Sequence, residues 1–482
     1  MSTPPVPGTS PGPSHRGPFD RAYQQGIHAQ LGPPQRPASA PAQDPAAAVA
    51  AAPGETVALR GAVLTPDAAW DDGYVVVDRG VIAAVQQTPP SGVRTLETGG
   101  VIMPGLIDLH GHPEFNVFAA WEPPTLFANR YRWRGSDVYQ ALIRDPQNTL
   151  LTKLAPRTEL RYAEVRALVG GTTAIQGAGS GSATAADEPL VRNVDLYVFG
   201  QHRARAMIDL PSAGSQQADT LAHILTDIAA GRIDAFYLHL CEGRRGDQRS
   251  ASEYQRFLTF SAATSSTVLI HATALTPDQL HEVADAGCKL VWSPQSNIRL
   301  YGQTTLAAEA LAAGMPVALG ADWLPSGSTS LLAEMKVARR ELAVQGLELP
   351  AAELVAMVTS GAAAIAGLQD HLGSLAQGRP ADVLVLERHH DDVHENVCRA
   401  DPSWVELVMI GGDVAYARSD WFATLTGNAA GPTIEPLIAW GKAMTLDAGY
   451  RTGSAAAPAA PSLSTVRALL TDAYPQVGPI FA

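Results

Sequence analysis

The sequence has only three cysteines in 482 residues: Cys241, Cys288 and Cys398. An odd and sparse set cannot form a disulfide framework, and no two of them have the C-x-x-C spacing of a structural zinc knuckle. The chain also lacks an apolar run long enough to cross a bilayer, and its first residues lack the pattern of a signal peptide. We therefore expect a cytoplasmic protein that does not enter the membrane.

Positive charge is also in short supply, with 34 Lys and Arg against 47 Asp and Glu and a net charge of −13. Nucleic acids and anionic membranes require a basic face, so neither is expected as a partner. Hydrophobic residues make up 46% of the chain and charged residues 17%, which predicts a sizeable core. The length predicts two or three domains, or one large barrel with an appendage. A homo-oligomer is left open.

The two ends of the chain differ from its middle in composition and in the pattern of apolar residues. Residues 1–53 are rich in Pro, Ala, Gly, Ser and Gln, which predicts a disordered tail. Short β-branched runs follow over 56–85, separated by Asp-Gly and Arg-Gly pairs that favour hairpin turns, and similar runs return at 375–386 and 404–416. Because each flank alone is too short to close a core, we expect one domain built from both. The predicted division is a composite β-sandwich over 54–100 and 371–420, a barrel over 101–370 and a C-terminal extension over 421–482.

The middle of the chain alternates between strand-like and helical patterns. This alternation predicts a parallel barrel or an open α/β sheet. Two more strands are needed to make eight, and they are expected between 190 and 210. The strand-like runs lie at 101–109, 173–176, 235–240, 268–271, 289–292 and 317–320, and helical patterns lie at 276–286, 306–313 and 330–343.

The first of these runs ends in the triplet His110-Gly111-His112. Side chains two positions apart on a strand point to the same side, and chemistry in a parallel barrel sits at the carboxyl ends of the strands. Two neutral imidazoles that converge there form half of a divalent metal site. The triplet alone is a weak indication, because most histidines are surface residues or hydrogen-bonded core residues.

Three later runs end in the same kinds of residue. His239 closes one and is followed by Glu242, His271 closes a second, and Asp322 closes a third. A chain without a site would scatter His and Asp among helices and loops. The set therefore predicts a metal-dependent catalytic site.

The order of these residues along the chain resembles the pattern of the amidohydrolase superfamily. The pattern consists of the triplet after Pro104-Gly105, the His239-x-x-Glu242 step, His271, the run 293–297 (Ser-Pro-Gln-Ser-Asn) and Asp322. The resemblance covers about 55–420 and is to the branch of triazine hydrolases, cytosine deaminase and guanine deaminase. It implies a (β/α)8 TIM-like barrel with a small composite β-sandwich built from both flanks.

The resemblance also implies roles. A hydroxide bound to a divalent metal ion would attack an sp² carbon attached to nitrogen. The expected ion is zinc, with iron(II) as the alternative. Glu242 would move the protons, His271 would hydrogen-bond the hydroxide or the developing oxyanion, and Asp322 would orient the hydroxide. The implied metal ligands are His110, His112, His239 and Asp322.

A missing lysine bears on the number of ions. The two-metal branch of the superfamily bridges its ions with a carboxylated Lys on the fourth strand, and the only Lys between His112 and His239 is Lys153, which precedes the second strand. One ion is therefore expected. The predicted function is hydrolysis of non-peptide carbon–nitrogen bonds in a small molecule, by deamination of a nitrogen heterocycle or opening of a cyclic amide. The alternative is a non-catalytic member of the superfamily that acts in assembly. Such relatives have usually lost metal ligands.

Some further residues have two interpretations. Glu114 could contact substrate or be an ordinary loop carboxylate, and Arg130 with its aromatic neighbours over 121–133 could line the pocket or pack the loop. Cys241 is expected to fill space, and the histidines at 389, 390 and 394 to lie in a solvated loop.

Overall fold

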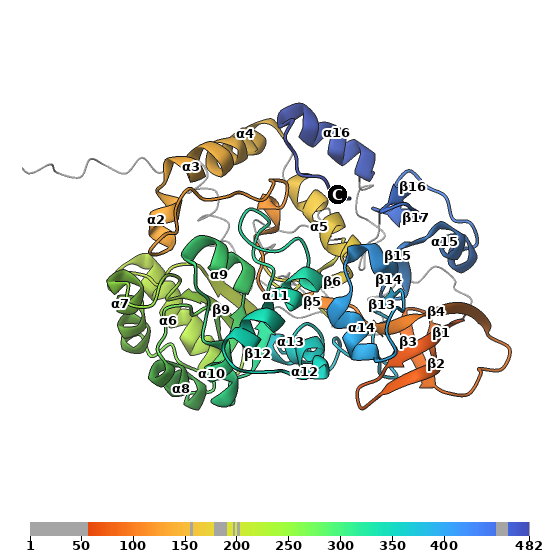
Figure 1. Cartoon of the computed structure of the whole chain (residues 1–482), viewed down its shortest axis with the longest axis horizontal. Coiled ribbons are helices and arrows are strands. Elements are labelled where there is room, and N and C mark those ends of the chain that lie inside the picture. The colour runs from red at the N-terminus through yellow and green to blue at the C-terminus, as the bar shows by residue number, and fades with distance from the viewer. Residues whose placement is uncertain are drawn as a thin grey trace, which may run out of the picture.

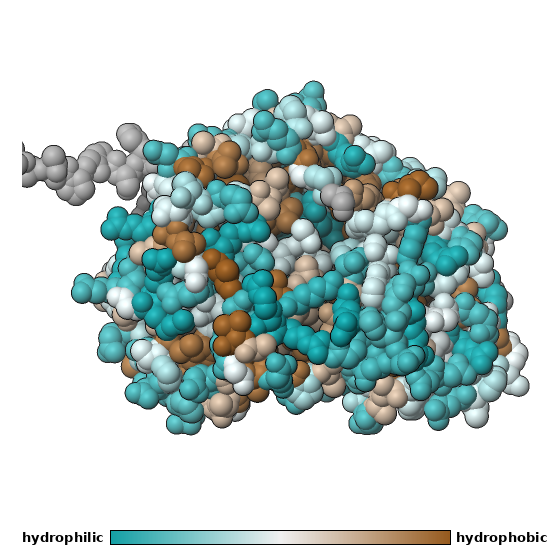
Figure 2. All heavy atoms as spheres, viewed as in Figure 1, coloured by the Kyte–Doolittle hydropathy of each residue, from teal (hydrophilic) through white to brown (hydrophobic). Residues whose placement is uncertain are grey.

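The computed structural model describes residues 56–154, 158–177, 190–195, 198–199, 203–449 and 461–481 (Figure 1). The tail predicted over 1–53 lies outside these residues. Among the described residues, no helix combines the length and apolar character that crossing a membrane requires. Polar side chains cover most of the face seen in Figure 2, with apolar side chains in scattered patches.

A nine-stranded mixed sheet contains strands from both ends of the chain, which lie together on one side of the molecule in Figure 1. The two flanks meet where β4 pairs antiparallel with β13, with Val101 opposite Leu386. This sheet agrees with the composite β domain expected from the sequence. Its strands, in sheet order, are β16 (Ile434–Ala439), β17 (Lys442–Asp447), β15 (Asp413–Arg418), β14 (Val405–Ile410), β13 (Val383–Leu386), β4 (Arg94–Pro104), β1 (Val57–Leu64), β2 (Ala69–Asp78) and β3 (Val81–Gln86).

Four local expectations for the two flanks of the chain are corrected. The Asp72-Gly73 pair lies inside β2 and not in a turn, because Gly73 pairs with Gly61 of β1. Of the run 375–386, only the last four residues form a strand. His394 lies in a helix, α14 (Val393–Arg399), whose first turn is capped by the Asp392 side chain. The sheet also continues into β16 and β17, which the sequence had placed in a separate extension.

Eight parallel strands make up two further sheets, of three and five strands. A bridge between Gly111 and Asp322 links the end of the first of these strands to the end of the last. They are β5 (Leu106–Asp108), β6 (Thr172–Ile175), β7 (Arg192–Asn193), β8 (Ala204–Met207), β9 (Ala235–Leu240), β10 (Thr267–His271), β11 (Lys289–Trp292) and β12 (Val317–Leu319). The short β7 and β8 are the two strands expected between 190 and 210.

The run 101–109 is not one strand, as the sequence had indicated. Its first part belongs to β4 in the nine-stranded sheet, and β5 begins after Gly105. A Cβ at Gly105 would lie 2.2 Å from the side-chain oxygen of Thr173, so this crossing point requires glycine. Apart from Asp108 the run is apolar or glycine, and both of its halves are buried, each in a different sheet.

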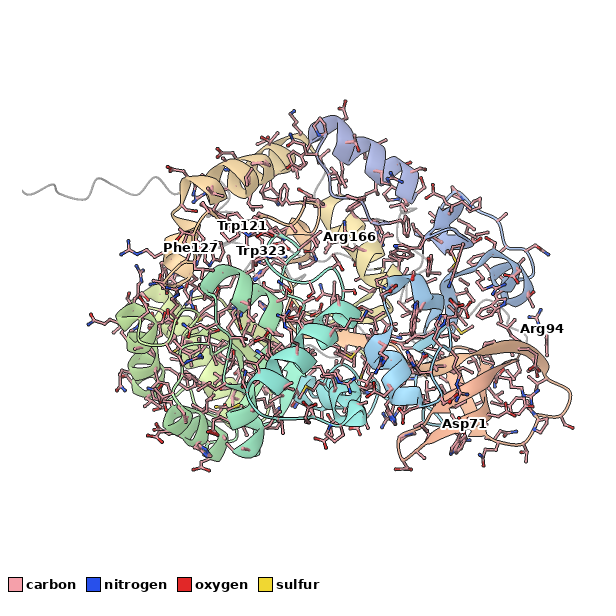
Figure 3. All side chains as sticks on the ribbon, in the orientation of Figure 1. Asp71, Arg94, Trp121, Phe127, Arg166 and Trp323 are labelled. Carbon is pink, nitrogen blue, oxygen red and sulfur yellow. The ribbon has the colours of Figure 1, made fainter. Side chains whose placement is uncertain are left out.

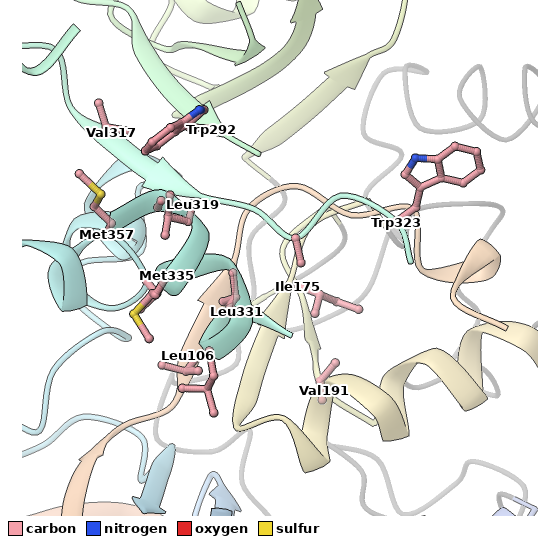
Figure 4. Close-up of a cluster of buried hydrophobic side chains, with 14 of the residues drawn as sticks. Leu106, Ile175, Val191, Trp292, Val317, Leu319, Trp323, Leu331, Met335 and Met357 are labelled. Carbon is pink, nitrogen blue, oxygen red and sulfur yellow. The ribbon is translucent and has the colours of Figure 1, made fainter. Parts of the chain in front are cut away.

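Side chains from the parallel strands form one buried apolar cluster that includes Ile107, Ala174, Tyr237, Ile270 and Ala318. The opposite faces of these strands pack on helices, and Figure 4 shows Leu106 and Leu319 beside Leu331 and Met335 of α11. The helices that follow the strands are α5 (Thr158–Val169), α6 (Gln216–Ala229), α7 (Gln248–Thr259), α8 (Pro277–Asp285), α9 (Pro294–Tyr301), α10 (Ala307–Ala312), α11 (Leu331–Val344), α12 (Ala351–Ala356) and α13 (Ser360–Ala366). The loop after β5 holds α2 (Arg130–Arg134), α3 (Asp137–Tyr139) and α4 (Asp145–Lys153), and the C-terminal part holds α15 (Ser419–Thr426) and α16 (Leu463–Ala473).

A buried ion pair joins the parallel strands to the nine-stranded sheet. Arg192 of β7 donates to both carboxylate oxygens of Asp382, at 2.6 and 2.8 Å. Asp382 directly precedes β13 and also accepts from the backbone N–H of Gly411 at 2.8 Å. The two-point geometry fixes the orientation of the two parts as well as their contact.

Candidate metal centre

Three histidines and an aspartate that the sequence assigned to a metal converge at the ends of β5, β9 and β12. Nε2 of His110 lies 3.2 Å from Nε2 of His239 and 3.4 Å from Oδ1 of Asp322. Nε2 of His112 lies 3.7 Å from the same aspartate oxygen. Two ligands bound at about 2.05 Å under a tetrahedral angle are about 3.3 Å apart, so these separations suit a divalent ion.

The protonation of the histidines also suits a metal. Burial is the main cause that lowers the pKa of all four histidines in the site, to about 4 for His112 and about 3 for His271, and well below the ordinary value for His110 and His239. They are therefore neutral at physiological pH, which is the form that binds metal. Nδ1 of His110 lies 2.7 Å from the hydroxyl of Ser293, so that ring nitrogen can donate and leave Nε2 free to face the other ligands.

His271 and Glu242 lie on the other side of the same site. Nε2 of His271 is 3.8 Å from Oε2 of Glu242 and 4.0 Å from Oδ2 of Asp322. His271 can also join His110 and His239 in a group of possible ligands within 4.8 Å of one another. The structure thus brings together all six residues that the sequence singled out.

The backbone at three strand ends takes a left-handed conformation. Cys241, His271 and Asp322 have φ of +51°, +66° and +61°. Such values are unfavourable for residues other than glycine and occur where function requires a particular direction of the side chain. Cys241 is fully buried in the apolar core, as expected, and its turn places Glu242 beside the histidines.

One face of α9 contacts the site at several points. Ser293 precedes the helix and touches His110, and Nδ2 of Asn297 lies 2.9 Å from Nδ1 of His271. Tyr301, at the end of the helix, donates to Oε1 of Glu242 at 2.5 Å. These three positions are four residues apart, which places them along one stripe of the helix. The sequence motif included Ser293 and Asn297 but gave them no role, and it did not include Tyr301. The spacing of four residues was the one signal in the sequence that could have pointed to Tyr301.

The loop after β5 is packed by ion pairs at Arg130. This side chain is 1% exposed and pairs with Glu253 at 3.1 Å and with Asp209 at 3.0 Å. Glu253 in turn accepts from the backbone N–H of Cys241 at 2.8 Å. Of the two interpretations of Arg130, the structure favours packing, because its charge is already paired.

Aromatic side chains of this loop gather beside Asp322. Trp121, Phe127 and Trp323 lie close together in Figure 3, and the Trp133 and Trp323 rings are 5.3 Å apart. This cluster gives the loop an apolar wall next to the metal-binding residues. Glu114 is half-buried, and among the described residues its Oε2 has no hydrogen-bond partner. Burial raises the pKa of Glu114 to about 7.

The family model described as "Amidohydrolase family" matches residues 101–415, which is well over half of the chain. The chain belongs to this family. It is therefore a metal-dependent hydrolase of carbon–nitrogen bonds other than peptide bonds, with a histidine-rich site of the kind described above.

Individual proteins also resemble the chain in sequence or in fold. A 5-methylthioadenosine/S-adenosylhomocysteine deaminase of Halobacterium salinarum is 26% identical over 419 residues, covering 75% of this chain and 90% of the relative. Among solved structures, an adenosine deaminase from Xanthomonas campestris with bound zinc has a TM-score of 0.57 at 18% identity, covering 75% of this chain and 92% of that one. Guanine deaminase of E. coli has a TM-score of 0.57 at 17% identity, covering 75% and 100%. At these identities the structures show the fold alone.

Proposed function

We propose that the chain is a mononuclear metal deaminase that removes an amino group from a small nitrogen heterocycle. The observation that carries the proposal is that three neutral histidines and one aspartate converge as possible metal ligands, with the carboxylate of Glu242 close to them. The architecture proposed with it is a closed (β/α)8 TIM-like barrel. The Gly111–Asp322 bridge supports closure, and so does the apolar cluster to which seven of the eight strands contribute side chains.

The proposed ligands of the ion are His110, His112, His239 and Asp322, with zinc first and iron(II) as the alternative. When bound, such an ion lowers the pKa of a water molecule toward neutrality and so supplies a hydroxide nucleophile. The absence of a lysine between β6 and β9 supports a single ion, because no bridging carboxylated lysine can form there.

The remaining steps fall to side chains of the chain itself. Glu242 accepts the proton of the water molecule and returns it to the leaving amino group. His271 hydrogen-bonds the attacking hydroxide or, where a cyclic amide is opened, the oxyanion that develops from its carbonyl. Asn297 contacts Nδ1 of His271 and so orients the ring with Nε2 toward the reacting atoms.

For the substrate, the proposed class is a purine or related ring with an exocyclic amino group. The relatives support this class, since they are deaminases of methylthioadenosine and S-adenosylhomocysteine, of adenosine and of guanine. The aromatic wall of the loop after β5 suits a planar ring, since stacking on aromatic faces favours flat substrates. Opening of a cyclic amide uses the same groups and is the alternative reaction.

The test is ammonia release by zinc-loaded protein from methylthioadenosine, S-adenosylhomocysteine, adenosine, guanine and a triazine. Loss of a hydantoin is followed by chromatography, because opening of its ring releases no ammonia. We expect turnover of an aminopurine, and E242Q should retain the metal and lose at least about 10²-fold in kcat. A folded E242Q protein that keeps full turnover would refute the proposed role of Glu242. A folded chain that binds no metal would instead favour the non-catalytic alternative.

A further inference from the structure

Tyr301 and Glu242 form a hydrogen bond that neither the family pattern nor the proposed mechanism requires. The phenol oxygen lies 2.5 Å from Oε1, and both side chains are almost completely buried. The other carboxylate oxygen, Oε2, is the one that lies 3.8 Å from His271. The two oxygens of Glu242 therefore have different surroundings.

Trp133 determines the direction of that hydrogen bond. Its indole Nε1 lies 2.9 Å from the phenol oxygen of Tyr301. An indole N–H can only donate, so Tyr301 must accept there. The single proton of the tyrosine is then free to point at Glu242, and Oε1 must act as the acceptor.

The ring of Tyr301 is held firmly in place. Tyr301 is the last residue of α9, and Gly302 after it has φ of +69°, which ends the helix in a left-handed turn. A Cβ at Gly302 would lie 2.5 Å from Leu126, so the loop after β5 packs directly on this turn. Trp133 and Tyr301 thus lie on two elements that pack directly on each other.

We propose that Tyr301 is a positioning residue that occupies Oε1 of Glu242 and so reserves Oε2 for proton transfer, and that Trp133 enforces this arrangement. The proposal rests on the proposed role of Glu242 as the proton carrier. Because Oε1 accepts from Tyr301, it is the less basic of the two oxygens, and a proton taken from water goes preferentially to Oε2, which faces His271. The same contact fixes the carboxylate plane, and small displacements of a catalytic group cost large factors in rate.

The kinetic test uses methylthioadenosine as the probe, with Y301F, W133F and the double variant. We expect Y301F to lower kcat by about 10- to 100-fold with KM changed less than about threefold, because the hydroxyl acts on proton transfer and not on binding. W133F should lower kcat of the wild-type chain several-fold but should not lower kcat of Y301F further, because its effect on kcat passes through the hydroxyl; any effect on KM is common to both backgrounds. Equal effects of W133F in both backgrounds, or a Y301F protein with wild-type kcat, would overturn the proposal.

Tyr254 provides a matched control. It is another buried tyrosine whose hydroxyl donates to a glutamate, Glu282, but this bond joins α7 to α8 and involves none of the metal-site residues. Y254F loses the same kind of bond and should keep kcat and KM. A fall in kcat as large as that of Y301F would show that the effect is structural.

A crystal structure of Y301F answers the question without any substrate. We expect the Glu242 carboxylate to rotate or to occupy more than one orientation, while the metal ligands keep their places. An unchanged Glu242 would overturn the proposal. If E242Q abolishes turnover while Y301F does not affect it, only this inference fails and the proposed function stands.

Discussion

Nδ1 of His110 lies 2.7 Å from the hydroxyl oxygen of Ser293, across 183 residues of sequence and with both side chains fully buried. The contact fixes the rotation of the imidazole and sets which nitrogen faces the other ligands. Such outer contacts of metal-binding histidines affect affinity as well as orientation.

Replacement of this hydroxyl should therefore weaken metal binding. We expect S293A to bind zinc about 10- to 100-fold more weakly than the wild type, measured by competition with a chromophoric chelator. Ser266 offers a control, because it lies at the amino end of β10 and its hydroxyl bonds only the carbonyl of Ile233 in the described structure. S266A should bind zinc normally, and equal affinities for S293A and S266A would contradict the role given to Ser293.

A second prediction concerns the backbone between the two histidines of the triplet. Gly177 has φ of +93°, and a Cβ there would lie 1.7 Å from the carbonyl oxygen of Gly111. G177A must push Gly111 aside and displace His110 and His112, so we expect loss of tight zinc binding in a chain that still folds by circular dichroism. Gly346 has a similar φ of +84° but open space around it, so G346A separates backbone strain from the clash. Normal zinc binding by G177A would show that Gly111 can move without cost to the site.

A buried acid behind the site should make stability depend on pH. Burial raises the pKa of Glu334 from 4.5 to about 8, while the backbone N–H of Gln295 donates to its Oε1 at 3.0 Å. The folded state therefore binds this proton more tightly than the unfolded state. The resulting stability is fully present below pH 4.5 and is lost as the pH rises through about 8.

The check is urea unfolding of wild type and E334Q across this range. A glutamine keeps the acceptor for Gln295 and cannot ionise, so the variant should lose less stability between pH 5 and 9, by on the order of a few kcal/mol. Parallel pH profiles of the two proteins would contradict this account of Glu334.

The joint between the two parts of the fold gives a fourth prediction. Removal of Arg192 leaves Asp382 buried and without its charged partner, so R192M should lower the free energy of unfolding by about 3–5 kcal/mol. The double variant R192M/D382L removes both charges and should be less destabilised than R192M. Chemical denaturation measures both, and additive losses would show that the pair does not act as a unit.

The strands of the parallel sheets were the best predicted part of the fold, because 235–240, 268–271 and 289–292 are short apolar runs buried on both faces. β7 and β8 could not be placed, because β7 has only two residues and both strands bury an arginine. The division of 101–109 between two sheets was also not visible in the hydropathy, because the residues on both sides of the break at Gly105 are apolar and buried.

The residues of the site were predictable for a similar reason. His239 and His271 lie at the ends of β9 and β10, and Asp322 lies three residues after β12, so their positions follow from strand order at one end of a parallel sheet. Tyr301 and Trp133 were not predictable in the same way. Their role depends on a contact between α9 and the loop after β5, separated by 168 residues, and no local pattern encodes it.

The most direct test of the account is an anomalous-difference map at the zinc edge from crystals of the zinc-loaded protein. The account predicts one peak for each chain, at about 2.0–2.2 Å from Nε2 of His110, His112 and His239 and from a carboxylate oxygen of Asp322. Two peaks, a peak bound by His271 in place of His112, or no peak in a folded chain would contradict it.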